Sequence, residues 1–120
     1  MAQILFVDDD SLTLQLMTRA AQLLGHEAVC DPSARRALQW AAQNRPALTL
    51  VDLSMMEMSG IQFVGALRAQ PETKDLPVLI FSASQDIEDR EKAVAAGANG
   101  YLLKPLNFGE LSKVIRQFIP

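Results

Sequence analysis

Short apolar runs alternate along the chain with longer segments in which apolar residues recur every three or four positions. Short apolar runs bounded by turn residues are typical of buried strands, and the three- and four-residue spacing is typical of helices with one apolar face. The pattern predicts five strand–helix pairs. The strands are expected at Gln3–Val7, Glu27–Cys30, Ala47–Val51, Pro77–Phe81 and Gly100–Leu103, and the helices at Ser11–Leu24, Ser33–Gln43, Gly60–Ala69, Ile87–Ala96 and Phe108–Phe118.

Capping and turn residues mark several of the predicted helix ends. Asp10 or Ser11 is expected to cap the first helix, because short polar side chains accept hydrogen bonds from free N–H groups there. The pair Asp31-Pro32 is expected to open the second helix, as a capping residue followed by proline. Glycine tolerates the left-handed backbone that commonly follows a helix, so Gly25 and Gly97 are expected to end the first and fourth helices.

The predicted strands at 3–7, 47–51 and 77–81 are apolar at nearly every position. Strands of this kind are covered on both faces, which is typical of parallel strands with helices on each side. With short connections, the alternation predicts one α/β domain over residues 1–120, a doubly wound five-stranded parallel sheet with helices on both faces. We expect the flavodoxin-like strand order 2-1-3-4-5, in which ligands bind at the carboxyl ends of the strands, beside the first and third strands.

Composition narrows the function classes. Apolar residues make up 49% of the chain and charged residues 21%, which is typical of a globular domain. The net charge of −3 argues against direct nucleic-acid binding. No apolar stretch is long enough for a membrane span and no signal peptide is visible, so a cytoplasmic location is expected. The single cysteine, Cys30, excludes an intramolecular disulfide and is expected to be a small buried residue.

Polar residues follow four of the predicted strands. Asp8, Asp9 and Asp10 follow the first strand, Asp52 the third, Ser82 the fourth and Lys104 the fifth. Each has an ordinary explanation when taken alone, such as a helix cap, a turn or a solvated surface residue. Because the carboxyl ends of parallel strands meet at one edge, their coincidence predicts one site.

This set of groups suits phosphoryl transfer. Two or three carboxylates offer the oxygen ligands that Mg²⁺ prefers. A carboxylate can also act as the nucleophile and form an aspartyl phosphate. A metal ion, an ammonium and a hydroxyl can each hold one of the negatively charged oxygens of the transferred group.

The chain resembles the receiver domain of two-component response regulators over essentially its whole length. The resemblance rests on Asp8-Asp9, Asp52, Ser82-Ala83 and the segment Tyr101-Leu102-Leu103-Lys104-Pro105, with Gly60 and Ala96-Gly97-Ala98 also matching. It implies a phosphorelay signalling module that accepts a phosphoryl group from a histidine kinase or a histidine phosphotransfer protein. It also implies a protein that assists its own phosphorylation and dephosphorylation but is not an enzyme acting on an external metabolite.

The resemblance also implies residue roles. Asp52 would be the phosphoacceptor, and Mg²⁺ would be bound by Asp9, by Asp52, by the backbone carbonyl of Ser54 and, through water, by Asp8. Lys104 and Ser82 would bind phosphoryl oxygens, and the Lys104–Pro105 bond would be cis. Movement of Ser82 would let Tyr101 turn. The surface made of Ile87–Ala96, Gly100–Leu103 and Phe108–Phe118 would contact the output partner, or a second copy in a phosphorylation-dependent homodimer.

Two positions depart from the family pattern: Met56 replaces a usual proline, and Ser59 replaces a common acidic residue. The loss of proline gives the loop backbone more freedom. Other function classes remain open at this point. A phosphohydrolase of the haloacid dehalogenase type would need a second Asp where Ser54 stands, and a flavin-binding module would need a phosphate loop where the three Asp stand. A degenerate receiver used only as a scaffold is the fourth class.

Overall fold

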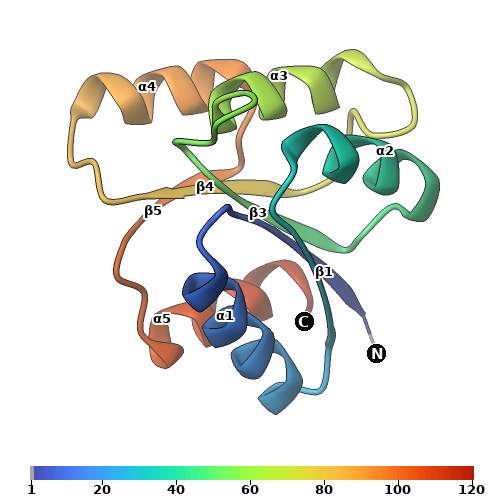
Figure 1. The fold of residues 1–120 in the computed structure, drawn as a ribbon, viewed down its shortest axis with the longest axis vertical. Coiled ribbons are helices and arrows are strands. Elements are labelled where there is room, and N and C mark those ends of the chain that lie inside the picture. Colours follow the sequence, from blue (N-terminus) through green and yellow to red (C-terminus); the bar gives the residue numbers. More distant parts are fainter. Residues whose placement is uncertain (1) are drawn as a thin grey trace.

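A computed structural model describes residues 2–120 and shows strands and helices in strict alternation (Figure 1). The type and order of every predicted element are confirmed. The strands are β1 (Gln3–Val7), β2 (Glu27–Asp31), β3 (Leu48–Asp52), β4 (Val78–Ser82) and β5 (Gly100–Leu103). The helices are α1 (Ser11–Leu23), α2 (Ala34–Asn44), α3 (Gly60–Ala69), α4 (Ile87–Ala96) and α5 (Phe108–Phe118).

The strands form one parallel sheet in the order β2-β1-β3-β4-β5, so the predicted flavodoxin-like topology is confirmed. The register aligns the carboxyl ends of neighbouring strands. Val7 pairs with Val51, Asp52 with Phe81, and Ser82 with Leu103. The residues that follow β1, β3, β4 and β5 therefore emerge at one edge of the sheet.

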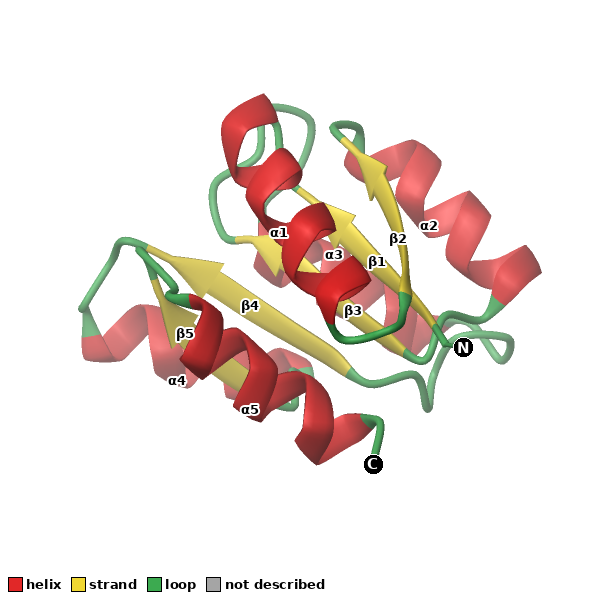
Figure 2. Ribbon diagram, turned by 90° about the horizontal axis from the view of Figure 1, so that it is seen from below, coloured by secondary structure: helices red, strands yellow, loops and turns green. Residues whose placement is uncertain are grey.

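Helices cover both faces of the sheet. Figures 1 and 2 show α2, α3 and α4 on one face and α1 and α5 on the other. Each face has its own apolar core, because alternate strand residues point to opposite sides. One core contains Leu5, Val7, Val51, Val78 and Ile80, and the other contains Ile4, Phe6, Leu50, Leu79 and Phe81. No helix within residues 2–120 combines the length and apolar character needed to cross a bilayer.

Strands β3 and β4 begin and end one residue later than the hydrophobic pattern predicts. Polar side chains at Asp52 and Ser82 suggested that the strands had already ended. The backbone continues the ladder, however, because Asp52 pairs with Phe81 and the Leu53 N–H donates to the Phe81 carbonyl oxygen at 3.1 Å. Two predicted site residues are thus the last residues of rigid strands.

Gly97 caps the end of α4 as predicted, whereas the caps of α1 and α2 differ from the prediction. Asp10 stands at the N-cap of α1 but makes no side-chain capping hydrogen bond, and the C-cap is Leu24, with Gly25 following it. Gly25 and Gly97 have left-handed backbones, with φ of 83° and 109°. Asp31, however, belongs to β2, and Ser33 caps α2 by accepting from the Arg36 N–H at 3.3 Å. The Asp31 carboxylate instead accepts from the Ser33 N–H at 2.8 Å, so it fixes the capping residue rather than capping the helix.

The prediction that Cys30 is buried is wrong, because its side chain is exposed. Cys30 lies on β2, which is an edge strand. One side of an edge strand has no neighbouring strand, and its residues are only partly covered. The Cys30 sulfur lies 3.0 Å from the Thr18 hydroxyl oxygen of α1, at the rim of the sheet.

Candidate functional site

Three carboxylates meet at the carboxyl edge of the two central strands. Asp8 and Asp9 directly follow β1, and Asp52 is the last residue of the neighbouring β3. One ligand oxygen from each lies within 4.8 Å of those of the other two. Asp8 is fully buried and Asp52 is 8% exposed, whereas Asp9 is open to solvent. The predicted convergence of these residues is therefore present in the structure.

A single ammonium group faces this cluster. The Lys104 Nζ lies 3.1 Å from the Asp8 Oδ2 and 3.3 Å from the Asp52 Oδ1. It also lies 4.7 Å from the centre of the Phe81 ring, which is within the range of a cation–π contact. The Lys104–Pro105 peptide bond is cis, as expected from the sequence. One positive charge is thus shared by two buried carboxylates, and a third carboxylate lies beside them.

The electrostatics reflect this imbalance. Burial raises the pKa of Asp52 above its ordinary value; Lys104 opposes the rise, the charge of Asp8 adds to it, and the Ser54 N–H opposes it. Burial by itself would lower the pKa of Lys104, but its contacts with Asp8 and Asp52 raise that pKa overall. The site therefore keeps its ammonium protonated and holds Asp52 in an environment that disfavours a bare carboxylate.

Asp10 lies outside this cluster. It stands at the N-cap position of α1 without capping a backbone N–H, and its carboxylate accepts a hydrogen bond from the Thr13 hydroxyl at 2.5 Å. That bond is the main reason that the pKa of Asp10 is lowered. Its backbone N–H donates to the Asp8 Oδ1 at 2.9 Å. Asp10 thus contributes to the site through its backbone, which orients the buried carboxylate of Asp8.

Ser82 ends β4 beside the acidic cluster and is 6% exposed. Its hydroxyl oxygen accepts from the Ser84 N–H at 3.0 Å, which leaves the hydroxyl proton free to be donated. The Ser84 hydroxyl donates to the Asp89 Oδ2 at 2.6 Å. The loop after β4 is thereby tied to the first turn of α4. Sequence reasoning missed this tie, because nothing in the pattern pairs Ser84 with Asp89.

Tyr101 is connected to the same loop. It lies on β5, and its hydroxyl donates to the Ser84 carbonyl oxygen at 3.0 Å. The Arg90 guanidinium of α4 lies 5.6 Å from the centre of its ring. The aromatic side chain therefore lies between β5, the loop after β4 and α4.

Ser54 lies in the loop of residues 53–59 that follows Asp52, and its side chain is exposed. The two ends of this loop are joined, because the Gly60 N–H donates to the Leu53 carbonyl oxygen at 2.8 Å. Gly60 packs tightly there: a Cβ at this position would lie 2.6 Å from the Asp52 carbonyl oxygen. The backbone on both sides of Ser54 is thus held close to Asp52.

The donor set fits a hard divalent cation. Within residues 2–120 it consists of carboxylate oxygens with no nitrogen or sulfur ligand, and one ammonium, that of Lys104, opposes it. Oxygen ligands of this kind suit Mg²⁺, which keeps several waters and needs few protein ligands. The surplus negative charge of Asp8, Asp9 and Asp52 is what such an ion would neutralise.

The fold and the site define a class of α/β domain with an acidic, lysine-paired pocket beside the topological switch point. The family model described as response regulator receiver domain matches residues 4–116. The chain belongs to this family, and it is therefore a receiver domain of the two-component type. This assignment favours the receiver over the dehalogenase-type and flavin-binding alternatives.

Several curated relatives are named as transcriptional regulatory proteins. The transcriptional regulatory protein PrrA of Mycobacterium tuberculosis is 38% identical over 109 residues, which cover 91% of this chain and 46% of PrrA. The transcriptional regulatory protein BasR of Escherichia coli is 34% identical over 117 residues, which cover 98% of this chain and 52% of BasR. The chain thus spans about half the length of these relatives.

Solved structures share the whole fold. The chemotaxis protein CheY4 of Vibrio cholerae is 32% identical with a TM-score of 0.92, and the match covers 98% of both chains. The receiver domain of the sensor histidine kinase PA1611 of Pseudomonas aeruginosa is 25% identical with a TM-score of 0.90, covering 98% of this chain and 97% of that one. The PA1611 structure holds a magnesium ion in its active site cleft.

Proposed function

We propose that Asp52 of this domain accepts a phosphoryl group, in a Mg²⁺-dependent reaction, from the phosphohistidine of a histidine kinase or a histidine phosphotransfer protein. The observation that carries the proposal is the meeting of three carboxylates and Lys104 at adjoining strand ends. A scaffold that had lost the chemistry would have no reason to keep two carboxylates buried beside a shared ammonium. The retained charge cluster therefore favours an active receiver over a degenerate one.

Asp9, Asp52, the backbone carbonyl of Ser54 and, through water, Asp8 would hold Mg²⁺. When bound, the ion supplies positive charge for the phosphoryl oxygens and lessens the repulsion among the carboxylates. The exposure of Asp9 supports a direct ligand role, since it can reach an ion at the mouth of the site. Asp8 is fully buried and already bonded to Lys104 and to the Asp10 N–H, which suits a more distant role.

In the transfer step, an Asp52 carboxylate oxygen attacks phosphorus. The bond from phosphorus to the donor's histidine nitrogen breaks, and its electron pair stays on the imidazole. Lys104, now 3.3 Å from the Asp52 Oδ1, binds one oxygen of the phosphoryl group. The Ser82 hydroxyl, whose proton is free, donates to another. Hydrolysis by water reverses the modification, so the domain assists its own phosphorylation and dephosphorylation without acting on an external metabolite.

The signal would leave the site through Ser82 and Tyr101. A shift of Ser82 toward the phosphoryl group disturbs the hydrogen bond from the Ser84 N–H, and the Ser84 carbonyl is the acceptor of the Tyr101 hydroxyl. Tyr101 turns with its acceptor, which changes the surface formed by α4, β5 and α5. That surface would contact an output domain or protein in the cytoplasm, or a second phosphorylated copy, rather than nucleic acid or a membrane.

The test is labelling with a small phosphodonor. The chain is incubated with acetyl phosphate and Mg²⁺, and intact mass spectrometry measures the gain of one phosphoryl group. We expect an acid-stable, base-labile modification that requires Mg²⁺ and is lost in Asp52→Asn. Asp10→Asn is the matched control, because Asp10 is a neighbouring carboxylate outside the cluster, and it should label like the wild type.

Two results would contradict the proposal. Wild-type protein that stays unlabelled under conditions that label an established receiver would show that the site is inactive. Label that persists in Asp52→Asn would place the acceptor on another residue.

A further inference from the structure

One polar side chain attaches the segment 53–58, which precedes the α3 cap Ser59, to another element of the part of the domain described. Among residues 2–120, Glu57 is the only member of the segment 53–58 whose side chain forms a hydrogen bond or an ion pair with another element. Met55 and Met58 contact the core, but Met56 is 93% exposed and is not among the residues packed against it. Beyond these apolar contacts and the hydrogen bond that joins the loop ends, Glu57 supplies the side-chain polar contact that holds the loop sideways.

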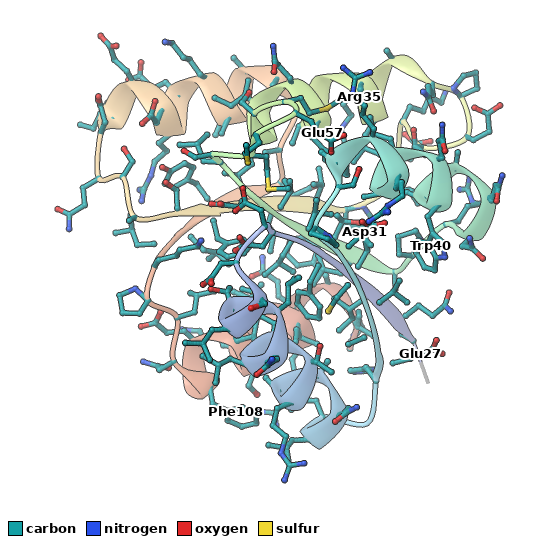
Figure 3. The ribbon with its side chains drawn as sticks, in the orientation of Figure 1. Glu27, Asp31, Arg35, Trp40, Glu57 and Phe108 are labelled. Atoms are coloured by element: carbon teal, nitrogen blue, oxygen red, sulfur yellow. The ribbon has the colours of Figure 1, made fainter. Side chains whose placement is uncertain are left out.

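Glu57 binds the N-terminus of α2. The Ser33 hydroxyl donates to the Glu57 Oε1 at 2.8 Å, and the Arg35 Nε lies 3.9 Å from the Oε2. Figure 3 shows Arg35 and Glu57 near each other, one on α2 and the other on the loop before α3. The Arg35 side chain is 72% exposed, so the ion pair is weak and the Ser33 hydrogen bond is the main tie.

The partner of Glu57 is itself fixed. The Ser33 N–H donates to the Asp31 Oδ1 at 2.8 Å, and the Arg36 guanidinium binds the same oxygen at 2.9 Å. Ser33 is also the capping residue of α2, where the positive end of the helix dipole favours a carboxylate such as Glu57. The loop is thus tied to a rigid point at the end of β2, not to a mobile surface side chain.

We infer that Glu57, through Ser33, positions the loop whose Ser54 carbonyl would bind Mg²⁺. This inference rests on the proposed function. A ligand carbonyl on an untethered loop loses conformational freedom on binding the ion, and this ordering weakens the affinity. The need is greater in this chain because Met56 stands where proline would stiffen the loop. Glu57 is a positioning residue, since it contacts neither the carboxylate cluster nor the acceptor.

The experiment compares Mg²⁺ affinity in three variants by isothermal titration calorimetry. Glu57→Ala removes the tie and should weaken Mg²⁺ binding about three- to tenfold, near the lower end of outer-shell effects on metal sites. Glu57→Gln keeps an acceptor for the Ser33 hydroxyl and should retain most of the affinity. Met56→Ala is the matched control from the same loop and should bind like the wild type. All three should melt at the wild-type temperature without metal.

A second readout separates loop positioning from damage to the acceptor. With acetyl phosphate, Glu57→Ala should need more Mg²⁺ for half-maximal labelling but reach the wild-type rate at saturation. Unchanged affinity in Glu57→Ala would overturn the inference. Equal losses in Glu57→Ala and Glu57→Gln would also overturn it, because they would show an effect of charge. A wild-type chain that binds no Mg²⁺ would instead refute the proposed function on which the inference rests.

Discussion

Replacing Asp52 by asparagine should make the metal-free domain more stable, although it removes an ion pair. The carboxylate is 8% exposed and shares one ammonium with the fully buried Asp8. Asparagine has nearly the same shape, and its carbonyl oxygen still accepts from Lys104. The substitution therefore removes the charge while leaving the packing and one hydrogen bond in place.

The competing energies can be compared from the distances. At an effective dielectric constant near 20, the 3.3 Å contact with Lys104 is worth about 5 kcal/mol, and repulsion from Asp8, which lies within 4.8 Å, costs about 3.5 kcal/mol or more. Asp9 adds a smaller repulsion, because it is exposed and screened. Taking a carboxylate out of water costs several kcal/mol more. The balance favours neutral asparagine, with an expected gain of about 1 to 2 kcal/mol.

The pH dependence has a defined sign. The pKa of Asp52 is raised in the folded state, so this state binds the proton more tightly than the unfolded chain. The contribution of Asp52 to the free energy of unfolding of the wild type is therefore present at low pH. It is lost as the pH rises from the ordinary Asp pKa through the raised pKa of Asp52. The advantage of Asp52→Asn should be largest near pH 7.5 and shrink toward pH 4.

The assay is thermal unfolding followed by circular dichroism in low salt with a chelator. The gain should raise the Tm by about 4 to 8 °C in a domain of this size. Mg²⁺ should raise the wild-type Tm and have much less effect on the variant. Asp10→Asn is the control, and it should not stabilise, because its carboxylate is exposed and favourably bonded to Thr13. A lower Tm for Asp52→Asn, or an advantage independent of pH, would refute the charge argument.

Three other substitutions test the structure. Thr49→Val should stabilise by about 1 kcal/mol in chemical denaturation, because the Thr49 hydroxyl is buried without a partner; a loss would imply a hidden hydrogen bond. Gly60→Ala should lower the free energy of unfolding by about 2 kcal/mol and slow phosphorylation, since the new Cβ would meet the Asp52 carbonyl oxygen. Wild-type stability and labelling rate in this variant would contradict that contact. Arg68→Met should lower the Tm by removing bonds to the Gly97 carbonyl and three other acceptors, and an unchanged Tm would show that water replaces them.

The central sheet and the acidic cluster could be predicted because each apolar run, and each polar residue that follows one, is recognisable in its own short stretch of sequence. The apolar runs of β1, β3 and β4 are buried at nearly every position, and a parallel sheet brings their ends together whatever the details. The predicted meeting of Asp8, Asp9, Asp52 and Lys104 followed from topology alone.

The edges of the sheet and the loop contacts could not be predicted in the same way. Cys30 looks like a core residue in the sequence, but its exposure depends on β2 being the last strand of the sheet. The tie between Glu57 and Ser33 joins two loops 24 positions apart. A pair of polar side chains at that distance leaves no periodic signal, because the contact depends on how two loops are folded and not on strand order.

If Asp52 accepts a phosphoryl group as proposed, the arrangement around Ser84 offers a path from the site to a helix surface. The Ser84 hydroxyl oxygen accepts from the nearby Asp86 N–H, and three further bonds lead away from the loop: its N–H donates to Ser82, its hydroxyl to Asp89 of α4, and its carbonyl accepts from Tyr101 of β5. A displacement of Ser82 therefore acts on one backbone unit that is already attached to both elements of the surface. Because these three bonds lie on one residue, the path needs no chain of packed side chains. Ser84→Ala removes the hydroxyl but keeps the backbone bonds, so it should weaken only the connection to α4. In that variant, amide exchange at the start of α4 should rise while the Tyr101 environment, followed by its fluorescence, stays unchanged; a change in both would show that the branches are not separate.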